Sequence, residues 1–158
     1  MIFIRKATEA DLATVLELIQ ELARFEKEPD AVEITIDDLK KQAFGSNPLI
    51  QILLAETDEK IIGMALFYYR FSTWKGKTIH LEDLIVRHEN RGSGAGSKLY
   101  SEILKIAHKE QIKRVEWVVL NWNHEAIAFY EKTGAQILPD WNTVQMDEKG
   151  IKNYINSL

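Results

Sequence analysis

A glycine run between an apolar strand and a helical segment constrains this chain more than any other feature. The run reads Arg91-Gly92-Ser93-Gly94-Ala95-Gly96-Ser97 and follows the apolar stretch Leu84-Ile85-Val86. Three glycines at alternate positions keep side chains away from a close ligand, and a turn that opens a helix directs backbone N–H groups at an anion. The run therefore predicts a cradle for the pyrophosphate of a nucleotide-bearing cofactor, with the positive charge of Arg91 at its mouth.

Two familiar phosphate-binding motifs do not match this run. A Walker A loop needs a second glycine where Ser97 stands, and Lys98 is followed by Leu99 rather than by Ser or Thr. The dinucleotide fingerprint needs glycine at the same place and usually lies in the first βα turn, whereas this run lies past the middle of the chain. A plain tight turn, with glycines that serve helix–strand packing, stays open as an alternative.

Length and charge limit the classes of protein to consider. We expect one domain over 1–158, because 158 residues suit a single core. The net charge of −4 argues against a nucleic-acid-binding surface. The chain has no cysteine, which excludes disulfides, a Cys-ligated metal site and a thiol nucleophile. No apolar stretch approaches a membrane span and the apolar N-terminus is too short for a signal peptide, so we expect a cytoplasmic protein without a membrane partner.

Hydrophobic periodicity predicts an α/β (α+β) chain in the order β-α-α-β-β-β-α-β-α-β, with one or two strands at the end. Thr8 with Asp11 and Thr35 with Asp38 resemble capping boxes, and Gly134 suits the residue after a helix. A meander followed by a βαβ crossover implies a mixed sheet with helices on both faces. We expect strands at 2–4, 49–56, 60–71, 78–86, 115–120 (buried) and within 135–146, helices at 12–25, 35–45, 93–109 and 123–132, and a hairpin turn at Thr57-Asp58-Glu59.

Two carboxylates interrupt the otherwise apolar strand at 79–86. Strict alternation places Glu82 and Asp83 on opposite faces, with Glu82 on the face of His80 and Leu84. A carboxylate in so apolar a strand costs free energy unless it is paired or useful. An ion pair at the sheet surface is the alternative to a functional role. The four histidines show no metal-ligand spacing, and we expect no metal.

Two motifs together resemble the GNAT superfamily of N-acetyltransferases. The glycine run resembles its R/Q-x-x-G-x-G/A acyl-CoA loop, and the segment from Asn123 to Ala135 resembles its N-x-x-A-x-x-F-Y-x-x-x-G-A/F motif. Further segments resemble the spermidine/spermine (diamine) N-acetyltransferases and their thialysine-acetylating relatives. Phe25 stands where the polyamine enzymes carry Tyr. These further segments are Ile4-Arg5-Lys6-Ala7-Thr8, Glu21-Leu22-Ala23-Arg24-Phe25-Glu26, Trp74-Lys75-Gly76-Lys77, Leu81-Glu82-Asp83 and Asn121-Trp122-Asn123.

The resemblance implies a GNAT fold, acetyl-CoA as cosubstrate and a homodimer. It places main-chain groups of the strand at 84–86 against the pantetheine amides, with one N–H at the thioester oxygen. It also makes Asn123 and Ala126 contacts of the cofactor, whereas a purely structural role for Asn123 would be to cap its helix. The residues implied for the cofactor are Leu84, Ile85, Val86, Arg91, Gly92, Ser93, Gly94, Ala95, Gly96, Ser97, Asn123, Ala126 and Tyr130.

The same resemblance implies acetyl transfer to a small primary amine, such as a diamine, a polyamine or a thialysine-like compound, directly in a ternary complex. Glu82 would contact the amine and act as base through water, and Tyr130 would protonate the leaving thiolate. Glu26, Asp83 and Trp74 would contact the substrate. Acetylation of another amino metabolite or a peptide amine, and a non-catalytic acyl-CoA sensor, are the alternatives.

Overall fold

The computed structural model describes residues 1–58 and 60–158, which form two compact units. The first is Met1–Val118 and the second is Val119–Leu158. Glu59, part of the expected hairpin turn, lies outside the described residues. None of the helices in the described ranges is long and apolar enough to span a membrane.

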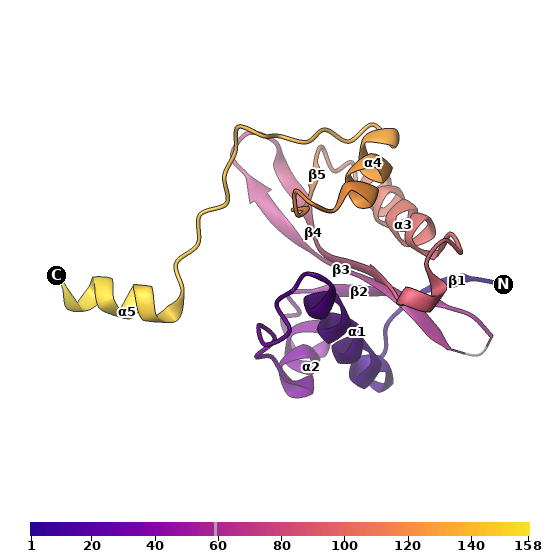
Figure 1. The fold of residues 1–158 in the computed structure, drawn as a ribbon, viewed down its shortest axis with the longest axis horizontal. Helices are drawn as coiled ribbons and strands as arrows, with labels where there is room; N and C mark the ends of the chain where they lie inside the picture. Colours follow the sequence, from indigo (N-terminus) through magenta and orange to yellow (C-terminus); the bar gives the residue numbers. More distant parts are fainter. Residues whose placement is uncertain (59) are drawn as a thin grey trace. The chain divides into compact units, whose positions relative to one another are not determined.

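The first unit is built on one five-stranded sheet in the order β1-β2-β3-β4-β5 (Figure 1). The first four strands are antiparallel, and β5 runs parallel to β4. The connection from β4 to β5 passes through helix α3, as a parallel pair requires. The expected mixed sheet is therefore confirmed. Its strands are β1 (Phe3–Lys6), β2 (Gln51–Glu56), β3 (Ile61–Ser72), β4 (Gly76–Val86) and β5 (Val115–Glu116).

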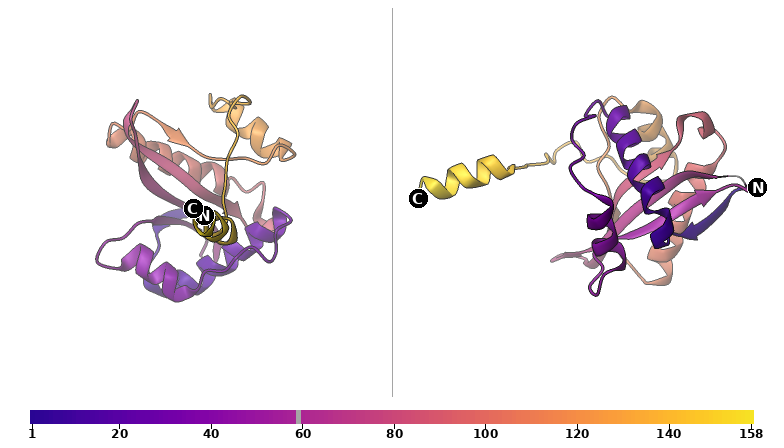
Figure 2. Two further views of the ribbon diagram at one scale, coloured as in Figure 1. Left: turned by 90° about the vertical axis from the view of Figure 1, so that its left-hand side faces the viewer. Right: turned by 90° about the horizontal axis from the view of Figure 1, so that it is seen from below.

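Helices cover both faces of this sheet (Figure 2). On one face, α1 (Leu12–Phe25) and α2 (Ile36–Phe44) pack against β2, β3 and β4 through a core that includes Leu18 and Leu39. On the other face, α3 (Ala95–Lys109) packs through Leu99 and Ile103. Both expected capping boxes form, one at the short 3₁₀ helix η1 (Glu9–Asp11) before α1 and one at α2. A second 3₁₀ helix, η2 (His88–Asn90), follows β4.

The strand expected at 115–120 is shorter and less buried than its composition suggests. Only Val115–Glu116 pairs, and β5 is the last strand in the sheet order. Val115 and Trp117 pack against the α3 side of the core, and the Trp117 ring meets Tyr100 edge-on at 5.7 Å. The apolar run therefore packs against the core on one side of the strand, whereas its composition predicts burial on both sides.

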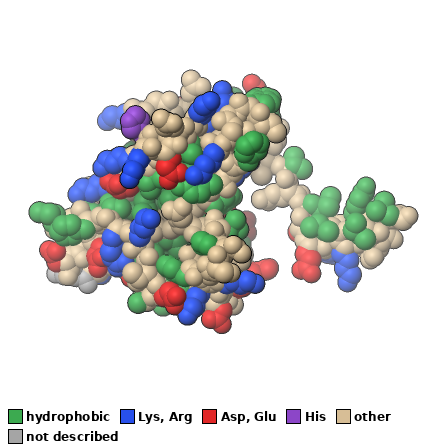
Figure 3. Space-filling view, turned by 180° about the vertical axis from the view of Figure 1, so that it is seen from behind, with side chains coloured by type: hydrophobic (Ala, Val, Ile, Leu, Met, Phe, Trp, Pro, Cys, Tyr) green, Lys and Arg blue, Asp and Glu red, His purple; other side chains and the backbone are tan. Residues whose placement is uncertain are grey.

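The second unit contains two helices, α4 (His124–Lys132) and α5 (Glu148–Asn156). Gly134 has φ +94° after α4, as expected for a left-handed helix end. The strands expected within 135–146 are wrong, because the described residues there form no strand. Helix α5 was missed: the Asp147 side chain caps it, and Ile151, Tyr154 and Ile155 form an apolar stripe at helical spacing. Figure 3 shows apolar side chains along one side of α5 and charged ones along the other.

Candidate active site

The glycine run forms a left-handed corner between η2 and α3. Gly92 has φ +77° and Gly94 has φ +87°, and a Cβ on either would meet nothing within 4 Å. Gly94 is the N-cap of α3, which moves the helix start from the expected Ser93 to Ala95. The first N–H groups of a helix have no intrahelical acceptor and carry the positive end of its dipole. An open, backbone-lined corner of this kind fits a pyrophosphate group.

The edge of β4 beside this corner has no neighbouring strand among the described residues. Among the described residues, β5 pairs with β4 only at Ile79 and His80. The Arg87 N–H donates to the Ile62 carbonyl on β3 at 2.8 Å. Because main-chain groups alternate along a strand, Ile85 also faces β3, whereas Leu84 and Val86 face away from it. The last two residues can therefore pair with an extended ligand.

Arg91 is held at this edge by an aromatic ring. Its guanidinium lies over the Phe25 ring at 4.6 Å from the centroid, and its Nε is 3.5 Å from the Val86 carbonyl oxygen. A guanidinium attracts the face of a ring through its quadrupole. The charge expected at the mouth of the corner is thus fixed against the C-terminal end of α1.

A β-bulge in β4 corrects the predicted placement of Glu82 and Asp83. Leu81 pairs with Phe67 and Asp83 pairs with Leu66, which leaves Glu82 as an extra residue without a partner on β3. Directly paired residues share a face, so the bulge puts Asp83 on the face of Leu66, which is the α1 face.

Glu82 points to the same face as Asp83. Its Oε2 accepts a hydrogen bond from the Tyr68 hydroxyl at 3.0 Å and lies 3.5 Å from His80 Nε2. Leu84, by contrast, packs on the α3 side. The expectation that Glu82 shares a face with His80 is confirmed. The expected separation from Asp83, and the shared face with Leu84, are wrong because the extra residue breaks the alternation.

Glu26, Glu82 and Asp83 form what we call the carboxylate cluster. Burial, followed by the charges of Glu82 and Glu26, raises the pKa of Asp83 to about 7. Burial also raises the pKa of Glu26, at the end of α1. The ion pairs of the described residues include no Lys or Arg partner for any of the three. A site with this charge suits a cationic ligand.

Trp74 is the one expected substrate residue of this unit that the structure keeps apart from the cluster. It is 77% exposed at the turn between β3 and β4. Gly76 and Glu82 are six residue steps apart along β4, which corresponds to roughly 20 Å. The structure therefore gives no contact between Trp74 and the carboxylates of the same chain.

In the second unit, Asn123 and Tyr130 are set by helix α4. The Asn123 side chain accepts a hydrogen bond from the Ala126 N–H at 3.3 Å, so Asn123 is the N-cap. Tyr130 lies two turns later with 8% of its surface exposed, and its ring packs edge-on against Phe129 at 5.4 Å.

Sequence reasoning missed Tyr68 and Arg70 as neighbours of the cluster. Tyr68 pairs with His80, and their rings lie 5.2 Å apart. The signal was present in the hairpin at 72–76, because residues equally distant from a turn face one another. Arg70 lies on the same strand as Tyr68, and its Nη1 is 3.2 Å from His80 Nδ1.

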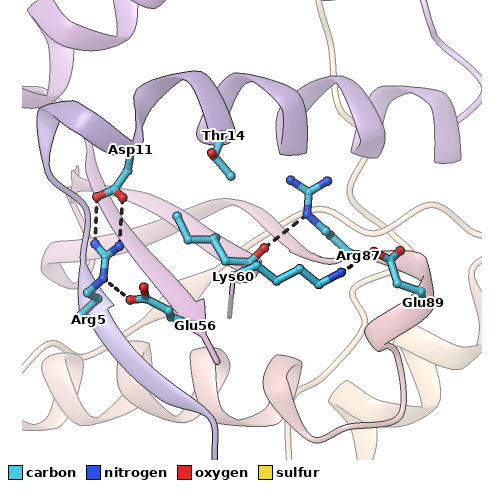
Figure 4. Close-up of a pocket in the computed structure, with 8 residues that line it drawn as sticks. Arg5, Asp11, Thr14, Glu56, Lys60, Arg87 and Glu89 are labelled. Carbon is cyan, nitrogen blue, oxygen red and sulfur yellow. Dashed lines mark hydrogen bonds and ion pairs between the residues drawn. The ribbon is translucent and has the colours of Figure 1, made fainter. Parts of the chain in front are cut away.

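The first unit also contains a hollow that is separate from the carboxylate cluster. It measures about 460 Å³ and contains three basic and three acidic side chains. Figure 4 shows the Arg5 guanidinium between Asp11 and Glu56, and Lys60 directed at Glu89. We call this site the charged hollow; it is lined by Arg5, Asp11, Thr14, Glu56, Lys60, Ile61, Arg87 and Glu89.

Comparison with known proteins identifies the family. Residues 12–135 match the acetyltransferase (GNAT) family. The chain is 34% identical over 162 residues to the thialysine N-epsilon-acetyltransferase of Bos taurus, which covers 96% of this chain and 95% of that protein. It is 34% identical over 139 residues to the human spermidine/spermine N(1)-acetyltransferase-like protein 1, covering 84% of this chain and 20% of that one.

The fold agrees with this match. An integron cassette protein from the mobile metagenome of V. cholerae superposes with a TM-score of 0.79 at 21% identity, over 98% of this chain and 97% of that one. The sequence relatives and the family match span both compact units of the chain. The protein therefore belongs to the GNAT acetyltransferase family and is an N-acetyltransferase.

Proposed function

We propose that this enzyme transfers an acetyl group from acetyl-CoA to a small primary amine, such as a diamine, a polyamine or a thialysine-like compound. The observation that carries this proposal is the carboxylate cluster, for which the described residues provide no Lys or Arg ion pair. Its Glu82 and Asp83 lie on the same strand as Leu84 and Val86, whose edge has no neighbouring strand among the described residues. The names of the relatives support the same substrate class.

The residues that would hold acetyl-CoA are main-chain groups of β4 and of the glycine corner, with Arg91 beside them. The open corner at Gly92 and Gly94 fits the diphosphate. The family resemblance adds Asn123 and Ala126 as contacts from α4. Bound there, acetyl-CoA supplies the acetyl group as a thioester.

The carboxylate cluster would bind the amine and remove its proton. An alkylammonium has a pKa near ~10.4, so it arrives charged at neutral pH. Glu82 would accept the proton through a water molecule, while Glu26 and Asp83 hold the cation. Tyr130 would donate its phenolic proton to the departing thiolate. Since the chain has no cysteine, no thiol acyl-enzyme can form, and transfer would be direct.

Three broader expectations belong to the same proposal. A single acetyltransferase domain over 1–158 is supported by the family match, which spans both compact units. A homodimer is implied by the resemblance, and sedimentation equilibrium tests it. A cytoplasmic location follows from composition and is tested by cell fractionation.

The test of the function is a thiol-release assay with acetyl-CoA across spermidine, spermine, putrescine, thialysine and lysine. We expect turnover with at least one of these amines. Acetyl-CoA binding by calorimetry without turnover on any amine would favour the sensor. Turnover only with other amino metabolites or peptide amines would favour that alternative.

A Tyr130→Phe variant tests the proton donor separately. It should bind acetyl-CoA with unchanged affinity and lose kcat by about 10²-fold or more. Wild-type turnover by this variant would remove Tyr130 from the chemistry.

A further inference from the structure

We propose that Tyr68, His80 and Arg70 are positioning residues that hold one oxygen of Glu82 and leave the other for the amine. This inference rests on the proposed function, because it assigns Glu82 its working geometry. Two groups converge on Oε2: the Tyr68 hydroxyl at 3.0 Å and His80 Nε2 at 3.5 Å. Among the described residues, the structure gives no hydrogen bond or ion pair to Oε1.

The contact from Arg70 decides which nitrogen of His80 carries the proton. Arg70 Nη1 lies 3.2 Å from Nδ1. A guanidinium only donates hydrogen bonds, so Nδ1 must accept and cannot hold a proton. In the neutral ring the proton therefore sits on Nε2, the nitrogen that faces Glu82.

Burial and the charge of Arg70 favour this neutral form, and together they outweigh the two nearby acids. Burial, the largest effect, lowers the pKa of His80, and Arg70 lowers it further, while Glu82 and Glu116 act in the opposite direction. The cluster partners on the neighbouring elements are Asp83 on β4 and Glu26 at the end of α1. At pH 8 the imidazole is thus an uncharged donor.

Arg70 is itself anchored by the adjacent strand. It forms an ion pair with Glu116 on β5, which Arg114 also contacts at 2.9 Å. The Tyr68 ring packs against the imidazole with an interplanar angle of 35°. Three strands therefore contribute to the orientation of a single carboxylate, which is how a bulged, half-exposed side chain can be kept in one rotamer.

The kinetic experiment compares kcat/KM for the amine in Tyr68→Phe with the wild-type value, both with and without the Glu82→Gln substitution. Loss of a hydrogen bond to the ionised carboxylate should lower kcat/KM by about tenfold, and this loss should vanish once Glu82 is replaced by Gln. The matched control is Tyr69→Phe, which removes a phenol from the next residue of β3. The Tyr69 hydroxyl bonds Glu110 at 2.7 Å, away from the cluster, so kcat/KM should stay at the wild-type value. Equal kcat/KM in all three proteins overturns the proposal.

The second experiment does not depend on activity. Nitrogen-15 NMR of the folded full-length chain at pH 8 should show His80 protonated at Nε2, and Arg70→Met should turn this into a mixture of tautomers. A wild-type His80 protonated at Nδ1 overturns the proposal. If the wild type acetylates no amine, the proposed function fails, while this measurement still decides the arrangement of His80.

Discussion

The two charged clusters of the first unit differ in how their charges are balanced. In the charged hollow, Arg5 is shared by Asp11 and Glu56, and Lys60 pairs with Glu89. In the carboxylate cluster, no Lys or Arg of the described residues forms an ion pair with the acids. The pKa of Asp11 is lowered, chiefly by its hydrogen bonds with Arg5, whereas the pKa of Asp83 is raised to about 7 by burial and its acidic neighbours.

Under the proposed function, this difference separates carboxylates that stabilise the fold from carboxylates that bind the substrate. Paired carboxylates stabilise the native state, whereas carboxylates crowded together without cations lower its stability, and pKa values perturbed in this way cluster at functional sites. The charges of the hollow already pair with one another, whereas Glu82 and Asp83 lie on the strand whose edge at Leu84 and Val86 has no neighbouring strand among the described residues.

The largest effect should come from Glu82→Gln. If Glu82 is the base, kcat/KM for the amine falls by about 10²–10⁴-fold, with acetyl-CoA affinity unchanged. Glu89→Gln is the matched control in the hollow, and it should leave steady-state kinetics at the wild-type level. Equal activity of the two variants would contradict the claim that catalysis depends on the carboxylate cluster and not on the charged hollow.

Asp11→Asn should produce the largest loss of stability. It replaces one of the two oxygens that accept hydrogen bonds from Arg5, at 2.8 and 2.9 Å, with an NH₂ group that cannot accept, and it removes the negative charge. We therefore expect a cost of about 2–3 kcal/mol in urea unfolding at pH 7. Because the pKa of Asp11 is lowered in the folded state, this stabilisation exists above the unfolded pKa near ~4 and disappears as the pH falls below it. An unchanged unfolding midpoint at pH 7 would contradict the assignment.

Asp83→Asn should increase the free energy of unfolding at high pH, whereas Asp11→Asn decreases it. Between the unfolded pKa near ~4 and the folded value of about 7, the native state keeps a proton that the unfolded chain has lost, so wild-type stability falls as the pH rises. The variant cannot ionise. We expect it to match the wild type at pH 4 and to be more stable by on the order of 1–2 kcal/mol at pH 8, measured by urea unfolding. A variant that loses stability at pH 8 would show that Asp83 has a partner.

The smallest effect belongs to the pair of Lys60 and Glu89 at the rim of the hollow. Their atoms are 3.2 Å apart and both side chains are about half exposed. A double-mutant cycle with Lys60→Met and Glu89→Gln should give a coupling of about 0.2–1 kcal/mol that declines in high salt. A coupling that persists in 1 M salt would indicate a buried, structural pair instead.

Local rules predicted most of the first unit. The capping boxes at Thr8 and Thr35 locate two helix starts, and the apolar periodicity of 12–25 reproduces α1. These features depend on neighbours within four residues, which a sequence displays directly. The resemblance to GNAT enzymes then supplied the family, and the comparisons confirm it.

The remaining features depend on contacts that a linear pattern does not encode. Alternation cannot reveal the extra residue at Glu82, because a bulge is defined by the partner strand. The apolar residues at 135–146 have a pattern typical of a strand, yet no strand of the described residues pairs with them. Arg70 and Tyr68 lie beside His80 because of the register between β3 and β4. That register can be stated only when the pairing of both strands is known.

The bulge also determines which residues must be moved together when this pair of carboxylates is built into another protein. Copying Glu82 and Asp83 onto a regular hairpin would send one acid outward and push the other into packed hydrocarbon, because such a strand lacks the one-residue offset between Leu81 and Asp83. A designer who wants this arrangement on another scaffold must graft the insertion together with its facing residues, Leu66 and Phe67. Deleting Glu82 would restore regular pairing of Leu81 with Phe67 and of Asp83 with Leu66, so the other side chains of β4 would keep their present faces and only the site would lose an acid.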